Sequence, residues 1–315
     1  MTGELLNALP PREPASLPRK PVRAAPTALL IATLALAGGC AVNKDTGESQ
    51  WIVLNEQREI ALGTEAAPKF VTDYGGPIPA EDINQYVRHI GQQLSRTSGR
   101  PQLPWEFHVV DSSVINAFAL PGGKVFVSRG LLEKMDNEAQ LAGVLGHEIG
   151  HVTAKHANDA MARQIGFQAV LTGIGIATQH NEGAWLKVLG VGVEQGGTVF
   201  LLRYSRAQEY ESDLLGTRYM AAGGYNPRAL LEVLEILKEA GGHQEGSLQL
   251  LSTHPLPASR IKKLRQHIEQ TYPSSPGGVD DGYFRQRFAD TVIRNLAALP
   301  PARHGRKATG KSDDG

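Results

Sequence analysis

The sequence predicts a mainly α fold with a small β-sheet, an α+β architecture in which amphipathic helices pack beside a few short strands. Between residues 56 and 270, apolar side chains recur mostly at intervals of three and four, which is the period of a helix. Residues 105–128 differ, because short apolar and β-branched runs flank a Pro-Gly-Gly turn there, as in strands. Hydrophobic residues make up 41% of the chain and charged residues 20%, a composition typical of a folded protein with a core.

The first 40 residues resemble the signal of a bacterial lipoprotein. A proline-rich start with basic residues precedes a short apolar run, residues 28–37, and small residues then lead to Cys40. The run is too short to span a bilayer, which takes about 20 apolar residues. We therefore expect residues 1–39 to be a signal peptide and Cys40 to carry the lipid that anchors the mature chain. Ala41 follows Cys40, which resembles the signal for export to the outer membrane. A plain cleaved signal and a weak anchor helix are the alternatives.

The elements after Cys40 are expected in the following order. Residues 40–55 have no periodicity and predict a polar tether. Helical spacing predicts helices over residues 56–62 and 83–94, and WEFHVVD at 105–111 predicts a strand. INAFALPGGKVFVSRGLL, residues 115–132, predicts a strand, a tight turn, a second strand and the start of a helix.

The next helix is expected to begin near Asn137, because Asn137 and Gln140 have the spacing of a capping box. It runs to about Ala157, and its core-facing stripe consists of Leu141, Leu145, Ile149 and Val152. Three further helices follow, in SRAQEYESDLLGTRYMAAGG, in NPRALLEVLEILKEAGG and after the loop that begins STHPLPAS.

Two segments predict less regular structure. Residues 165–202 are apolar and glycine-rich in runs that charged or polar residues interrupt, which favours core or gate helices, with membrane contact as the alternative. After Tyr272 the chain is rich in Pro, Ser and Gly, and after about residue 300 its composition predicts disorder. We therefore expect a domain over residues 56–272 and a C-terminal extension over residues 273–315.

GVLGHEIGHVTAKHA, residues 143–157, places His147 and His151 four residues apart, so both imidazoles project from one face of a helix. Two histidines at this spacing with a glutamate between them form the HExxH pattern, which predicts two zinc ligands and Glu148 as a general base. Chance on a solvated helix is the alternative. His156 is five residues past His151 and leaves this face, so we expect it to be an outer group that supports the ligands or a surface residue.

A catalytic zinc usually has three protein ligands, so a second element must supply one more. SRAQEYESD offers Glu209 and Asp213 on one helical face, with Glu211 pointing nearly the opposite way. A ligand from this face with its neighbour as an outer carboxylate that orients a histidine is chemically coherent. An acidic, solvated helix face is the alternative.

Four motifs together resemble one group of zinc metallopeptidases, which contains the prenyl-protein (CAAX) proteases and bacterial periplasmic lipoprotein peptidases. They are HEIGH at 147–151, EYESD at 209–213, NAFALPGG at 116–123 and THPLPASRI at 253–261, in the order of that group. The resemblance implies a zincin-type (gluzincin) domain whose active-site helix packs beside a short sheet. Where the group often has alanine before the aspartate, this chain has Ser212, a small change that we expect to be tolerated.

The same resemblance implies the roles of the site residues. His147, His151 and Glu209 would hold one zinc per chain, Glu148 would be the catalytic base and Asp213 the supporting carboxylate. Apart from the resemblance, we expect His254, in THP, to stabilise the oxyanion or to approach the zinc as a fourth, inhibitory ligand. A loop histidine at the start of a helix is the alternative.

These features predict a zinc-dependent endopeptidase in the periplasm, lipid-anchored at Cys40 and held to the outer membrane. Its expected substrates are misfolded or misassembled envelope proteins. An extended substrate could add as an extra strand to a free edge of Lys124–Ser128. A strand that is internal to the sheet, with no exposed edge, is the alternative. Alternatives are a chaperone-like assembly factor with a latent or structural metal site and a small-molecule metallohydrolase. Lys and Arg together equal Asp and Glu at 32 each, which gives no support for nucleic-acid binding.

Overall fold

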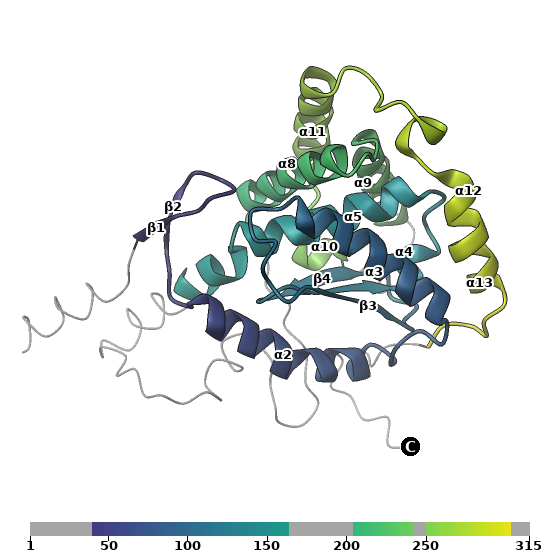
Figure 1. Cartoon of the computed structure of the whole chain (residues 1–315), viewed down its shortest axis with the longest axis horizontal. Coiled ribbons are helices and arrows are strands. Elements are labelled where there is room, and N and C mark those ends of the chain that lie inside the picture. Colours follow the sequence, from purple (N-terminus) through teal and green to yellow (C-terminus); the bar gives the residue numbers. More distant parts are fainter. Residues whose placement is uncertain (1–39, 164–203, 242–249, 304–315) are drawn as a thin grey trace, which may run out of the picture. The chain divides into compact units, whose positions relative to one another are not determined.

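A three-stranded sheet with helices on both faces lies at the centre of the described part of the chain (Figure 1). The computed structural model describes residues 40–163, 204–241 and 250–303. The predicted mainly α, α+β fold is confirmed. The predicted signal peptide, the 165–202 segment and the tail beyond residue 303 lie outside the described residues. Within the described ranges, no helix has the length and hydropathy of a membrane span.

The sheet has the order β3-β5-β4 and is mixed. β3 (Glu106–Val110) is parallel to β5 (Lys124–Ser128), and β4 (Ala117–Leu120) is antiparallel to it. β5 is therefore the central strand and is buried throughout, so the prediction of a free edge on Lys124–Ser128 is wrong. The three-residue turn between β4 and β5 contains Gly122 and Gly123, whose φ values of 76° and 89° suit glycine.

Alternating side chains of the sheet enter two different hydrophobic clusters. Phe118 and Phe126 point to α2 (Glu56–Asp73), where the Phe118 ring lies 5.1 Å from Phe70. Val125 and Val127 point to the opposite cluster, which is shared with α3 (Glu81–Arg96) and α5 (Glu138–Thr153). In Figure 1, α2 lies on one side of the sheet and α3 and α5 on the other. This alternation is what the period of two in a strand dictates.

α5 is buried along its whole length, because the sheet, α3, α8 and α9 all surround it. Its N-cap is Asn137, whose side chain accepts from the Gln140 N–H, while the Gln140 side chain accepts from the N–H of Asp136. α8 (Arg206–Ala222), α9 (Arg228–Gly241) and α11 (Ala258–Thr271) follow. Two one-turn helices, α4 (Arg129–Leu132) and α10 (Leu250–Thr253), connect these elements.

Residues 40–55 are not a free tether. β1 (Cys40–Val42) and β2 (Ser49–Trp51) form an antiparallel hairpin. Asn43 and Gln50 are buried in it, and their amides donate to the backbone carbonyls of Thr153 and Ala154 at the end of α5. A helix end leaves such carbonyls without partners inside the helix, so polar side chains from outside can satisfy them. The sequence showed polar residues here, but not the carbonyls that they bind.

The domain does not end at residue 272. Beyond it lie four short helical segments: η1 (Val279–Gly282), α12 (Arg285–Phe288), η2 (Ala289–Ile293) and α13 (Arg294–Ala297). Phe288 and Val292 are fully buried in the same cluster as α3 and α5, and Arg287 forms an ion pair with the buried Glu138 at the start of α5. The predicted boundary is therefore wrong, because residues 279–297 are part of the core.

Candidate metal centre

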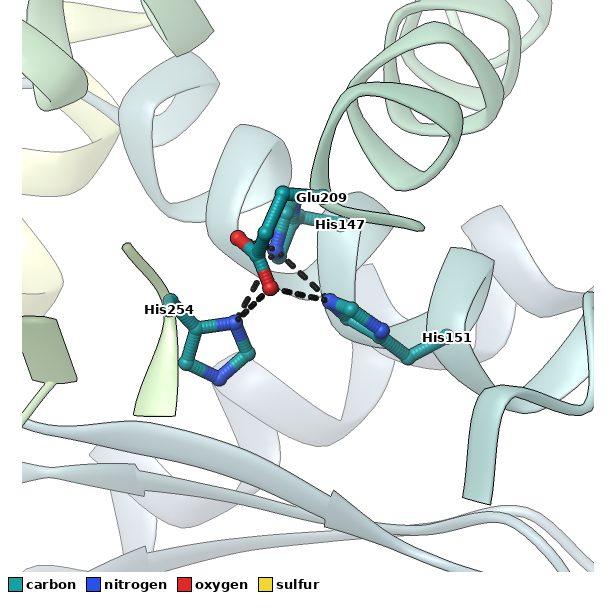
Figure 2. Close-up of side chains that lie close together, drawn as sticks. All are labelled: His147, His151, Glu209 and His254. Carbon is teal, nitrogen blue, oxygen red and sulfur yellow. Dashed lines mark hydrogen bonds and ion pairs between the residues drawn. The ribbon is translucent and has the colours of Figure 1, made fainter. Parts of the chain in front are cut away.

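α5 brings His147 and His151 together, one helical turn apart (Figure 2). Their Nε2 atoms are 3.0 Å apart, and both side chains are buried. The spacing of four residues therefore aims both nitrogens at one point, as predicted from the sequence. Histidines packed this closely and shielded from water are unusual without a shared purpose such as a ligand.

α8 crosses α5 closely because small residues lie at the crossing. A Cβ added to Gly216 would lie 3.0 Å from the His147 backbone nitrogen, and one added to Gly150 would lie 2.7 Å from Ser212 Oγ. Ser212 fits in this narrow space, and its hydroxyl donates to the backbone carbonyl of His147. The close crossing places Glu209 and Asp213 of α8 directly against the two histidines.

Four side chains offer ligand atoms to one point: His147, His151, Glu209 and His254. All these atoms lie within 4.8 Å of one another, and all four residues are buried. Glu209 Oε1 is 3.4 Å from His151 Nε2 and 3.0 Å from His254 Nδ1. His254 comes from the residue after α10, so a third segment of the chain reaches the cluster.

Asp213 supports His147 from the other side, since the His147 Nδ1–H donates to Asp213 Oδ1 at 2.9 Å. Arg260, at the start of α11, then binds two acidic residues of α8, Glu209 and Asp213. Its Nε and Nη2 donate to the two oxygens of Asp213, each at 2.7 Å, and its Nη1 donates to Glu209 Oε2. Sequence reasoning missed this role. A buried arginine is costly without a partner, but the burial of Arg260 was not visible in PASRI.

The charges of this cluster suit a divalent cation. Glu148, Glu209 and Asp213 are buried carboxylates, and among the described residues Arg260 is the one arginine that pairs with any of them, namely with Glu209 and Asp213. A doubly charged ion would balance the remaining negative charge, which fits the rule that buried charges are compensated. Two imidazole nitrogens and one carboxylate form a ligand set that zinc prefers at catalytic sites. The residues therefore fit the predicted metal.

Burial and the neighbouring charges have opposite effects on the pKa values of the cluster. Burial lowers the pKa of His147, but hydrogen bonds to Asp213 and Glu209 outweigh it and raise the pKa to about 9. Burial lowers the pKa of His151 below its usual value. The pKa of Asp213 is lowered, because Arg260 outweighs the effect of burial.

Glu148 lies beside the cluster rather than in it. Its Oε1 is 3.7 Å from His254 Nε2, and its Oε2 is buried without a hydrogen-bond partner among the described residues. Burial raises the pKa of this carboxyl group. A carboxylate with an unused oxygen and a raised pKa is suited to take a proton from a water molecule. A recess beside it is lined mainly by aliphatic side chains, among them Leu230, Leu234, Leu237, Leu250, Leu251 and Leu256.

His156 lies in the interior, not at the surface. α5 ends at Thr153, the chain turns at Lys155 with a φ of 57°, and residues 156–163 are helical again. This turn returns His156 to His151, where the two Nδ1 atoms are 2.8 Å apart. The helix predicted to run to Ala157 is therefore broken, and the break positions His156. Tyr204, which the sequence did not single out, stacks on the His151 ring at 3.9 Å.

Comparisons with known proteins agree with this site. The model of Peptidase family M48 matches residues 81–268. The beta-barrel assembly-enhancing protease of Yersinia pestis is 30% identical over 254 residues, which are 76% of this chain and 50% of that protein. The Escherichia coli K12 protein of the same name is 28% identical over 249 residues, with the same coverage. The mitochondrial metalloendopeptidase OMA1 of Schizosaccharomyces pombe is 30% identical over 216 residues, 67% of this chain and 61% of that protein. The chain spans about half the length of the first of these relatives.

Proposed function

The chain belongs to peptidase family M48, and from this membership we propose that it is a zinc-dependent endopeptidase of the bacterial cell envelope. The fold is of the gluzincin type that the sequence predicted. The observation that carries the proposal is the convergence of His147, His151 and Glu209 on one point with the base Glu148 beside it. The three ligand residues would hold one zinc ion per chain, with Asp213 as the supporting carboxylate.

In this proposal, the metal, Glu148 and Asp213 have separate roles in hydrolysis. The zinc would supply Lewis-acid chemistry, which stabilises negative charge on the carbonyl oxygen and activates water. Glu148 takes the proton of the attacking water and delivers it to the amine of the leaving peptide. Asp213 keeps the Nδ1 proton of His147 in place, so that Nε2 faces the metal.

The substrates that we propose are misfolded or misassembled envelope proteins, including those of the outer membrane. The names of two relatives, which link them to β-barrel assembly, support this choice. The leucine-lined recess next to Glu148 also supports it, because unfolded chains expose apolar side chains that such a recess can take. β4 is an outer strand of the central sheet and contacts α5, so it replaces Lys124–Ser128 as the strand that an extended substrate could join.

A proteolysis assay on a denatured outer-membrane β-barrel protein tests this function. We expect cleavage that a chelator stops and zinc restores. Suppression of aggregation without any cleavage, equal with and without chelator, would instead support a chaperone-like assembly factor.

We further propose that Cys40 is lipidated and holds the enzyme to the membrane, most simply the outer membrane, in the periplasm. The short apolar run and the small residues before Cys40 support this. Mass spectrometry of the mature protein tests it: a first residue other than Cys40, without acyl groups, would contradict the proposal.

Removal of the third ligand is expected to reduce bound metal sharply. Glu209→Ala removes the one carboxylate among the four clustered side chains, so the negative charge that faces the cation is lost and only imidazoles remain. We expect about one zinc per chain in the wild type and much less in Glu209→Ala after equal dialysis, as measured by elemental analysis. Glu235→Ala on α9, which removes an exposed carboxylate, is the control. Equal metal content in Glu209→Ala and the wild type would reject the ligand assignment.

Zinc uptake is expected to release a proton. In the metal-free protein the pKa of His147 is raised to about 9, above its ordinary 6.5, so this histidine is protonated at neutral pH. A ligating histidine must be neutral, so zinc must displace that proton. Below the pKa of His147, displacement of this one proton should make zinc affinity rise by about tenfold per pH unit. Above that pKa the affinity should no longer depend on this proton. Calorimetry in two buffers of different ionisation enthalpy measures the release; a value of zero would show that His147 is neutral before binding.

His254 is proposed to hold the enzyme in a resting state. Its Nδ1 lies with the ligand atoms of the other three residues, and its Nε2 faces Glu148, which favours a fourth ligand over an oxyanion donor. An imidazole in that position would exclude the water that Glu148 must deprotonate, until substrate moves the loop.

We expect His254→Ala to raise basal cleavage of a short peptide and self-cleavage, because the open position becomes accessible. Initial rates with and without a protein substrate measure this. A loss of roughly a hundredfold or more would instead identify His254 as an oxyanion donor. Unchanged rates would leave it neither role.

A further inference from the structure

The second zinc-ligand candidate, His151, is connected to the protein surface by a chain of two side chains. His151 Nδ1 lies 2.8 Å from His156 Nδ1, and His156 Nε2 lies 2.8 Å from Glu211 Oε2. His156 is completely buried, whereas 28% of the Glu211 side chain is exposed. None of these contacts uses the atoms that face the metal site, because His151 directs its Nε2 to Glu209 and His147.

The far end of this chain determines the direction of its hydrogen bonds. An ionised Glu211 can only accept, so His156 must donate from its Nε2. A neutral His156 then has a lone pair on Nδ1, which can only accept from His151. His151 must therefore carry its proton on Nδ1, and its Nε2 lone pair is left facing Glu209 and the shared point of the cluster. The opposite tautomer of His151 would place two lone pairs against each other at Nδ1.

We propose that His156 and Glu211 are positioning residues that select the zinc-binding tautomer of His151. They do for His151 what Asp213 does for His147, where a carboxylate accepts from Nδ1 directly. The two ligands of the HExxH helix are thus supported differently, one by a carboxylate and one through an intervening imidazole. Outer groups of this kind change metal affinity about 10- to 100-fold when they are removed. This inference rests on the proposed function only in assuming that the cluster binds zinc.

The break in the helix after α5 supports this role over simple packing. His156 would leave the ligand face on a continuous helix, and the left-handed backbone at Lys155 brings it back. A non-glycine residue in this conformation is strained, because its Cβ lies too close to the following carbonyl oxygen. Lys155 is held there with help from an ion pair to Glu59.

Glu211 also changes the interpretation of the sequence. Because Glu211 points away from Glu209 on the helix, the sequence predicted that Glu211 has no role at the metal. Its carboxylate is indeed not one of the clustered ligand groups. Its hydrogen bond to His156 nevertheless links it to the opposite side of a ligand. We therefore expect its loss to weaken zinc affinity without removing a ligand, so that a sample with excess zinc can remain fully loaded.

Zinc dissociation constants of the full chain, measured by competition with a chromophoric chelator, test the proposal. We expect Glu211→Ala to weaken zinc binding about 10- to 100-fold. Glu211→Gln should retain most of the affinity, because its amide oxygen can still accept from His156. His156→Phe should weaken binding at least as much as Glu211→Ala, and Glu235→Ala, an exposed carboxylate of α9, should have no effect.

A second measurement separates positioning from stability. The urea midpoint of the zinc-free protein should be similar in Glu211→Ala and Glu235→Ala, whereas a purely structural role would lower it in the former and leave zinc affinity unchanged. Equal zinc affinity of Glu211→Ala and the wild type, or a loss in Glu211→Gln as large as in Glu211→Ala, would overturn the proposal. A wild type that binds no zinc would overturn the proposed function itself, and this inference with it.

Discussion

Glu148→Gln is expected to lower the turnover number for peptide hydrolysis by about 10²- to 10⁴-fold while zinc remains bound. Glutamine has nearly the same shape as glutamate, but its amide can neither take the proton of the attacking water nor return it to the leaving amine. Glu148 is fully buried, and its Oε2 has no hydrogen-bond partner among the described residues, so this oxygen can accept the proton of a water molecule.

Two measurements are needed for this variant. Cleavage rates at saturating substrate give the loss of turnover, and elemental analysis shows that the metal is retained. Glu235→Gln on α9 is the matched control, since its carboxylate is exposed and distant in sequence from the cluster. If Glu148→Gln cleaves as fast as the wild type, the site is not the catalytic centre. If the variant also loses its zinc, the loss of activity does not test whether Glu148 is the general base.

The part of the site that follows from helical spacing could be predicted from the sequence. His147, His151 and Glu148 lie on one helix, and Glu209 and Asp213 on another, so the period of 3.6 residues determines which of them share a face. The sequence does not determine that the two faces meet. That depends on Gly150 and Gly216, which allow the helices to approach, and only the four linked motifs suggested the pairing.

The remaining features depend on long-range contacts that leave no local signal. Arg260 is 47 residues from Asp213, and a cation in an amphipathic helix is usually solvated. His156 reaches His151 only because the helix breaks at Lys155, where no glycine or proline marks the break. Residues 279–297 join the core although the Pro-, Ser- and Gly-rich segment before them is typical of a domain end. The composition of a segment indicates whether it can fold by itself. It does not indicate whether the segment packs against the rest of the domain.

The charge balance of the cluster leads to a second large effect, on stability. Arg260→Met is expected to lower the free energy of unfolding of the zinc-free protein by about 3–5 kcal/mol, because it leaves Asp213 and Glu209 buried without the guanidinium group that binds both of them. Methionine keeps a similar length and apolar stem, so lost packing contributes little. The free energy of unfolding of Arg260→Lys should lie between those of the wild type and Arg260→Met. An ammonium group cannot bind both oxygens of Asp213 and also reach Glu209 in the same way.

Urea unfolding of chelator-treated proteins measures this loss, and its pH dependence tests the cause. Arg260 lowers the pKa of Asp213, so in the wild type the pair contributes stability above the unfolded pKa of that carboxyl group, and the contribution is lost as pH falls through the folded one. Without Arg260, burial should raise this pKa instead, and protonation would relieve the penalty on acidification. The difference between Arg260→Met and the wild type should therefore be largest at neutral pH and shrink toward acid pH.

Arg265→Met, which breaks an exposed pair with Glu235, should cost no more than about 1 kcal/mol at any pH. An Arg260→Met loss as small as that, or one independent of pH, would show that the cluster does not need this cation, and that the carboxylates are compensated in another way.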